Sequence, residues 1–314
     1  MDKQDPANMP SGPREAAPSS SPLSGNLYFG PHGLRAGWRF FLYLAMVLLG
    51  LFSVNIYARH GGRGLHTKAA IWNLLIGEVV VCAVAFIPAV IMSFVEKRAF
   101  GAYGLPARQA FGKQFWIGTL WGLVSFSVLI LALRALGVFE FGSLAEHGLR
   151  AVKFGVFYAG LFLVVGFTEE FLLRGYSQFT LAEGIGFWPA GVVLSLTFGA
   201  LHIGNSGEAV IGIIGVIMIG LIFCLTLKRT GSLWFAVGMH AAWDWAESFV
   251  YSVADSGNMA PGHLLHSSFH GSNWLTGGSV GPEGSVLIFI VLPALWILFD
   301  KTHPAKPAPL SSVS

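Results

Sequence analysis

The sequence predicts an all-α protein, a polytopic bundle of about eight transmembrane helices. Of its 314 residues, 54% are hydrophobic and 11% are charged, whereas a soluble protein carries about 25% charged residues. The mean hydropathy is +0.64. The net charge of +3 is too small to indicate a nucleic-acid partner. The two cysteines lie in apolar runs, so they predict neither a disulfide framework nor a cysteine-based metal site.

Composition divides the chain into five segments. Residues 1–34 are rich in Pro, Ser, Gly and Ala and predict a disordered N-terminal tail. The N-terminal transmembrane helices follow over 35–150, and a second group of helices occupies 151–250. The stretch 251–283 contains no Lys or Arg, as expected of an extracytoplasmic loop, and 284–314 holds the last transmembrane helix and a cytoplasmic tail.

Apolar runs set the positions of the helices. A helix that crosses a bilayer needs about 20 residues. One of the runs contains Gly118 and Gly122, a GxxxG spacing that permits close helix packing. Another contains Glu78, an intramembrane acid with no evident partner. The predicted spans are 38–57, 70–95, 114–136, 154–181, 187–205, 208–228, 232–252 and 284–300.

Lysine and arginine placement predicts the orientation. With the N-terminus inside, the inner segments hold 13 of the 19 Lys and Arg residues and the outer segments hold 6. Positive residues concentrate on the cytoplasmic side of membrane proteins. Both termini are therefore expected in the cytoplasm. The lack of an organelle signal favours the plasma (inner) membrane of a bacterium.

The fourth span carries adjacent carboxylates, Glu169 and Glu170, followed by Arg174. An ionisable residue inside a membrane marks a functional site by default, because charge there is costly. Glu170 and Arg174 are four residues apart, so they share a helix face and are expected to form a structural ion pair. Glu169 points about 100° away from Glu170. Glu170 is thereby neutralised, and Glu169 is free for chemistry. The simpler alternative is that the charged residues form only a salt bridge at the membrane interface.

Three further polar residues are expected at a similar depth. At 1.5 Å per residue, Glu169 and Asp244 lie about 18 Å above the inner boundary, His202 about 22 Å and His240 about 12 Å. This agreement requires the fourth helix to continue past Arg174. His240 and Asp244 are four apart and share a face. Three helices thus converge on one site within the bilayer.

Histidines and carboxylates together suit the activation of water. A carboxylate in a site of low dielectric constant can act as a general base near neutral pH. Glu169, His202, His240 and Asp244 could also bind zinc, which accepts such ligands and leaves a position for water. No cofactor is certain from the sequence, and neither an HExxH motif nor a Gly-x-Ser-x-Gly nucleophile elbow occurs.

The ordered residues resemble the CPBP family of intramembrane proteases (the Abi, or CAAX-protease and bacteriocin-processing, family). Its motifs read here as Glu169-Glu170-x-x-x-Arg174, Phe198-x-x-x-His202 and His240-x-x-x-Asp244. The resemblance covers about 150–250, so 151–250 is interpreted as the catalytic helical core. It implies peptide-bond hydrolysis, with Glu169 and His202 activating water and with His240 and the residue at 244 stabilising the oxyanion. The prenyl-protein branch usually has Asn there. An ionised Asp244 would repel an oxyanion, so it is protonated, orients His240 or ligates a metal.

The leading interpretation is therefore an intramembrane endopeptidase acting on a membrane-associated or lipidated peptide or protein. Its partners are that substrate and the lipid bilayer. Two alternatives stay open, a non-catalytic membrane scaffold or chaperone of the same family and a proton-coupled transporter, since intramembrane acids and histidines also build ion relays. The substrate, the cleavage site and the role of Glu78 are not readable from the sequence.

Overall fold

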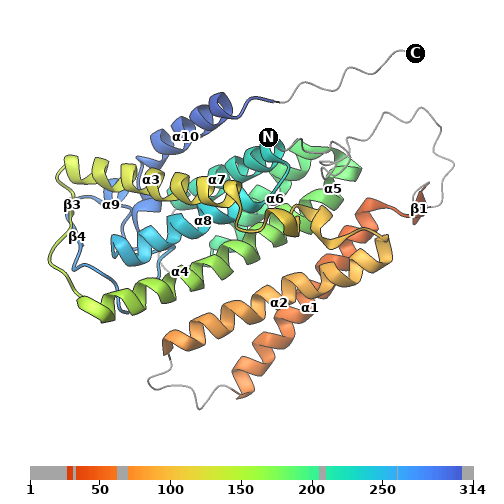
Figure 1. The fold of residues 1–314 in the computed structure, drawn as a ribbon, viewed down its shortest axis with the longest axis horizontal. Coiled ribbons are helices and arrows are strands. Elements are labelled where there is room, and N and C mark those ends of the chain that lie inside the picture. Colours follow the sequence, from red (N-terminus) through yellow and green to blue (C-terminus); the bar gives the residue numbers. More distant parts are fainter. Residues whose placement is uncertain (1–26, 31–32, 62–69, 205–209, 260, 306–314) are drawn as a thin grey trace, which may run out of the picture.

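The computed structural model describes residues 27–30, 33–61, 70–204, 210–259 and 261–305, and each of the eight predicted spans coincides with helix there. The prediction of an all-α membrane bundle is thereby confirmed (Figure 1). The longer helices are α1 (Ala36–Gly61), α2 (Ala70–Glu96), α3 (Lys113–Ala135), α4 (Gly148–Glu170), α5 (Gln178–Ile185), α6 (Phe187–His202), α7 (Val210–Thr230), α8 (Trp234–Trp245) and α10 (Ile288–Thr302).

Five helical stretches in the described ranges are long and apolar enough to cross a membrane, namely Ala36–Tyr57, Ile71–Glu96, Lys113–Ala135, Gly148–Ile185 and Val210–Thr230. The apolar helix α6 is shorter. Large apolar side chains face outward on these helices, among them Leu49 of α1, Phe94 of α2 and Val156 of α4, each at least 66% exposed. Such exposure is expected where lipid replaces water. The chain is therefore a multi-pass membrane protein.

The helix carrying the two glutamates does continue past Arg174. After α4, a π-helical stretch, Phe171–Ser177, leads directly into α5. Gly175 within it has non-helical backbone angles, φ −82° and ψ −115°. Isolated π turns inside α-helices are rare and frequent at functional sites. The continuation places Arg174 inside the bundle, which the predicted site requires.

Helix α8 packs between α3 and α4 at the centre of the bundle. Glycines permit the approach: a side chain on Gly118 or Gly122 of α3 would collide with backbone carbonyl oxygens of α8, and one on Gly238 of α8 would collide with the Phe115 carbonyl oxygen. The predicted close packing through the GxxxG spacing is thus present. On the opposite side, Gly166 of α4 faces the α8 backbone at 3.2–3.3 Å from where its Cβ would lie. This contact brings the two glutamates onto α8.

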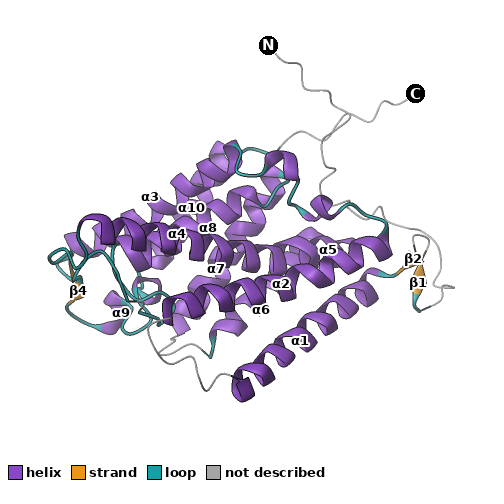
Figure 2. Cartoon of the chain, turned by 60° about the horizontal axis from the view of Figure 1, so that its bottom comes forward, coloured by secondary structure: helices purple, strands orange, loops and turns teal. Residues whose placement is uncertain are grey.

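Helices α1 and α2 form a slanted pair at one side of the bundle, with α1 outermost (Figures 1 and 2). Ion pairs fix them to α5 at one end of the molecule. Arg39 of α1 binds Glu96 of α2 at 2.8 Å and Glu183 of α5 at 2.5 Å, and Arg98 binds Glu183 at 2.9 Å. The pair is thereby held as one wall beside α4.

Short elements occupy both ends of the bundle. The strands β1 (Phe29–Gly30) and β2 (Gly33–Leu34) form an antiparallel hairpin within the segment predicted as a disordered tail, and residues 1–26 of that tail lie outside the described residues. Local contacts account for the hairpin, because the Arg35 amide donates to the Tyr28 carbonyl and Tyr28 packs on Trp38.

The stretch predicted as an extracytoplasmic loop is folded against the helices. It contains β4 (Ser268–Phe269), which pairs with β3 (Phe139–Glu140), as well as α9 (Asn273–Thr276) and a 3₁₀ turn, Pro282–Gly284. These elements gather at the end of the bundle opposite α5 (Figure 1). A second π-helical stretch, Ala246–Val250, extends α8 toward them. Two further 3₁₀ turns, Phe100–Tyr103 and Ala107–Gln109, connect α2 to α3.

Candidate active site

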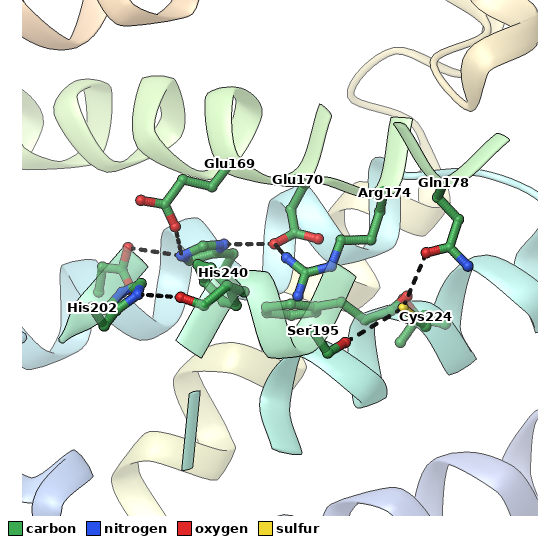
Figure 3. A network of polar contacts seen from close by, with 12 residues as sticks. Glu169, Glu170, Arg174, Gln178, Ser195, His202, Cys224 and His240 are labelled. Carbon is green, nitrogen blue, oxygen red and sulfur yellow. Dashed lines mark hydrogen bonds and ion pairs between the residues drawn. The ribbon is translucent and has the colours of Figure 1, made fainter. Parts of the chain in front are cut away.

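Glu169 and Glu170 approach the same imidazole from different sides. The Nδ1 atom of His240 donates to Oε1 of Glu170 at 2.9 Å, while its Nε2 lies 3.6 Å from Oε2 of Glu169 (Figure 3). Adjacent residues on a helix point about 100° apart. The pair of acids in α4 therefore brackets His240 of α8, one acid at each ring nitrogen.

The predicted ion pair between Glu170 and Arg174 is formed at 3.1 Å, and both side chains are completely buried. Arg174 also stacks on two aromatic rings, with its guanidinium carbon 4.6 Å from the Phe198 centroid and 5.5 Å from the Phe223 centroid. Gly220 of α7 leaves the space for it, since a Cβ there would lie 2.5 Å from Nη2 of Arg174. One arginine thus ties α4 to α6 and α7 at the level of the site.

His202 is the last residue of α6 and contributes the second histidine of the site. Its Nδ1 lies 2.8 Å from the Phe198 carbonyl oxygen, four residues earlier. A carbonyl only accepts hydrogen bonds, so Nδ1 is the protonated nitrogen and Nε2 is left as an acceptor. The Phe198 ring packs edge-on against His202 at 4.8 Å between centroids. The ring is therefore held in one tautomer and one orientation.

Asp244 lies one turn beyond His240 on α8, with Oδ2 3.5 Å from Nε2 of His240. It is therefore on the same ring nitrogen as Glu169. Sequence reasoning offered Asp244 as the acid that orients His240. The structure instead places Glu170 at hydrogen-bond distance of Nδ1, where an orienting acid acts. Sequence reasoning missed this second contact of Glu170, because helix spacing reports only partners on the same helix.

All four predicted site residues line one cavity of about 540 Å³. Glu169, His202, His240 and Asp244 share its wall with apolar residues that include Leu51 of α1, Leu74 of α2 and Leu201 of α6. Glu78 of α2 lines the same cavity. The sequence indicated that Glu78 is an intramembrane acid but did not predict its partner or its role. The contact between α2 and α4 could not be predicted, because the two helices are far apart along the chain.

The cavity extends to a group of acids that the sequence did not single out. Asp255 and Glu283, from the folded loop, line it as well, and one carboxylate oxygen of Glu247, in the α8 extension, lies within 4.8 Å of an oxygen of each. We call Glu247, Asp255 and Glu283 the loop acidic cluster. Burial and the neighbouring Glu283 raise the pKa of Asp255 to about 7.

Within the described residues, this loop acidic cluster is the one group of three acidic or histidine side chains close enough together to hold a metal ion. Glu169, His202, His240 and Asp244, for which zinc was considered, do not form such a group. Zinc at those four residues therefore stays a prediction.

The fold and the site define a class of protein, a multi-pass helical membrane protein with acids and histidines converging on a cavity inside the bundle. Residues 151–246 match the family model of the type II CAAX prenyl endopeptidase Rce1-like proteins. The match confirms the resemblance to the CPBP and CAAX protease family, and it covers α4 to α8, the helices that carry the site. That family is a protease family. None of the curated proteins compared with the chain matches it.

Proposed function

We propose that the protein is an intramembrane endopeptidase that hydrolyses a peptide bond of a membrane-associated or lipidated substrate. The observation that carries the proposal is that Glu169, His202 and His240, from three different helices, line one cavity within the bundle. Convergence of an acid and two oriented imidazoles on a partly apolar cavity supplies both a base for water and a donor for an oxyanion.

Water activation falls to Glu169 and His202. The Glu169 side chain is 34% exposed, and its nearest basic group, Nε2 of His240, lies at 3.6 Å, beyond a good hydrogen bond. Its carboxylate is therefore available to take a proton from a water in the cavity. His202 presents Nε2 as an acceptor because Nδ1 is occupied by the Phe198 carbonyl. The two groups together hold and deprotonate the attacking water.

Oxyanion stabilisation falls to His240. Acidic oxygens lie near both ring nitrogens, at 2.9 Å from Nδ1 and at 3.5–3.6 Å from Nε2, and their negative charge favours the doubly protonated ring. Glu170 accepts the hydrogen bond of Nδ1, while Nε2 lies 3.6 Å from Glu169 and 3.5 Å from Asp244 and is left to bind another acceptor. When the substrate carbonyl enters, Nε2–H donates to its developing negative charge, a contribution of about 3–4 kcal/mol in comparable sites. Asp244 serves beside it as a neutral acid, since an ionised carboxylate would repel the oxyanion.

The apolar part of the cavity wall supports a lipidated or strongly apolar substrate. Leu51 of α1 and Leu74 of α2 line the cavity together with the polar residues. The α1–α2 pair carries exposed apolar residues on its outer faces. A substrate held in the bilayer would reach the acids from that side. We propose a plasma (inner) membrane location and, on the charge distribution described above, both termini in the cytoplasm.

The test is cleavage by the purified protein in detergent of fluorogenic peptides, both prenylated and apolar. Glu169→Gln should lower the rate by roughly 10²–10⁴, the usual contribution of a general base, and the variant should remain monodisperse. Glu146→Gln is the matched control, because Glu146 pairs with the exposed Arg150 away from the cavity. Full activity of Glu169→Gln would remove Glu169 from the reaction.

Treatment of the purified protein with a chelator tests whether the site residues bind zinc. Phenanthroline binds zinc strongly and calcium weakly. Inhibition that zinc alone reverses, together with zinc in the purified protein, would assign the four site residues to a metal centre. Unchanged activity in phenanthroline would support water activation by Glu169 and His202 without zinc.

A further inference from the structure

Glu247 is the fully buried member of the loop acidic cluster. It lies one turn beyond Asp244 in the π-helical extension of α8, and its side chain is completely buried. Among the described residues, neither Oε1 nor Oε2 of Glu247 has a partner within hydrogen-bond geometry, and its close neighbour is another acid, Glu283. A buried carboxylate without compensation is strongly unfavourable, so this acid must take up a proton or a cation.

The other members of the loop acidic cluster face Glu247 from the folded loop. One carboxylate oxygen from each of Glu247, Asp255 and Glu283 can be chosen so that all three lie within 4.8 Å of one another. The two loop acids are already oriented. Ser248 donates to Asp255 at 3.2 Å, and the indole of Trp243 donates to Glu283 at 2.8 Å. The three acids therefore converge on a single point.

Within the described residues, no basic side chain forms an ion pair with these three acids. The stretch 251–283 contains no Lys or Arg. The loop acidic cluster is therefore neutralised by bound protons or by a cation from outside the chain, and a cation displaces the protons when it binds.

We propose that the loop acidic cluster is a binding site for a hard divalent cation of the Ca²⁺ type. Oxygen is the only ligand atom that these side chains offer, which suits Ca²⁺ and disfavours zinc or copper. The three oxygens lie within 4.8 Å of one another, close enough for one cation to contact all three at the 2.3–2.6 Å typical of Ca²⁺–oxygen bonds.

The backbone of Gly281 packs close to Glu247 and Ala254. A Cβ at this position would lie 3.3 Å from Oε1 of Glu247 and would collide with the Ala254 carbonyl oxygen. Its φ of +111° also favours glycine. The loop backbone thus approaches Glu247 closely, which a residue larger than glycine would prevent.

The cation would link two parts of the molecule. Glu247 belongs to the helix that carries His240 and Asp244, whereas Asp255 and Glu283 belong to the folded loop and line the cavity wall. Binding would therefore fix the loop to α8 at the far end of the cavity. This site is independent of the proposed peptidase activity, and its test needs no substrate.

Calcium binding to the full-length protein in detergent tests the proposal. After treatment with EGTA and its removal, equilibrium dialysis against radioactive CaCl₂ should give about one Ca²⁺ per chain, and CaCl₂ should raise the melting temperature. Glu247→Gln should weaken binding by roughly tenfold or more, since loss of even an outer-shell partner costs 10–100-fold. Asp255→Asn should do the same.

Glu140→Gln is the matched control. Glu140 is an exposed acid of β3 at the same end of the molecule, 3.8 Å from His270 and outside the cluster, so its loss should leave calcium binding unchanged. The proposal is overturned if wild type binds no Ca²⁺, or if Glu247→Gln and Asp255→Asn bind it as wild type does. Using both variants keeps the test valid should Glu247→Gln fail to fold.

Discussion

Replacing Glu170 by Gln should destabilise the protein far more than breaking a shorter ion pair on its surface. Glu170 and Arg174 are completely buried and lie 3.1 Å apart. Glu146 and Arg150 have the same four-residue spacing and lie only 2.7 Å apart, yet the Arg150 side chain is 72% exposed. The two pairs differ in the burial of the arginine and in the hydrogen bond that Glu170 also accepts from His240, whereas Glu146, at 13% exposure, is itself largely buried.

The expected magnitudes follow from desolvation. Removing one partner of a buried pair costs about 3–5 kcal/mol, because the other charge is left uncompensated. Arg174 already has two nitrogens, Nε and Nη2, without hydrogen-bond partners, so Glu170 is its principal anchor. Gln retains an acceptor oxygen, which favours the lower end, about 3 kcal/mol. The exposed pair is worth at most about 1 kcal/mol, so Glu146→Gln should change the free energy of unfolding by no more than that.

The assay is equilibrium unfolding in mixed micelles by sodium dodecyl sulfate, followed by tryptophan fluorescence. A double variant, Glu170→Gln with Arg174→Met, separates the orphaned charge from lost packing. It should recover most of the stability lost in Glu170→Gln, because a neutral pair of similar volume removes the buried charge. Equal losses in Glu170→Gln and Glu146→Gln, or a double variant less stable than Glu170→Gln, would refute the reasoning.

Two further predictions concern α8. Gly122→Ala should destabilise the protein by about 1–3 kcal/mol or more, because the added Cβ would strike the Met239 carbonyl oxygen. Gly160→Ala is the control and should be tolerated, since nothing lies within 4 Å of its Cβ. Equal unfolding curves for the two variants would contradict the packing of α3 on α8. Asp244→Asn should keep partial peptidase activity, because an amide can also donate a hydrogen bond beside the oxyanion. His240→Ala should lower the peptidase rate by roughly 10²-fold or more. If Asp244→Asn were as inactive as His240→Ala, Asp244 would have a role that needs its carboxyl group.

The sequence alone predicted the helical fold and the residues of the site. Hydropathy located the helices, because a bilayer imposes a length and an apolar composition that any spanning helix must satisfy. Helix periodicity predicted the pair of Glu170 with Arg174, since residues four apart share a face. Glu169 was predicted to be functional because a charged residue inside a membrane is energetically costly. These inferences depend on local geometry, which a sequence carries directly.

Only the tertiary structure decided which partners meet across helices. Glu170 reaches His240, 70 residues away, because the close packing of α4 on α8 at Gly166 brings them together. Glu78 enters the cavity from α2. The loop acidic cluster joins the extension of α8 to a stretch whose composition indicated only an exported loop. Such contacts depend on the order, tilt and rotation of packed helices, which small residues and side-chain volumes determine jointly and which no spacing along the chain records.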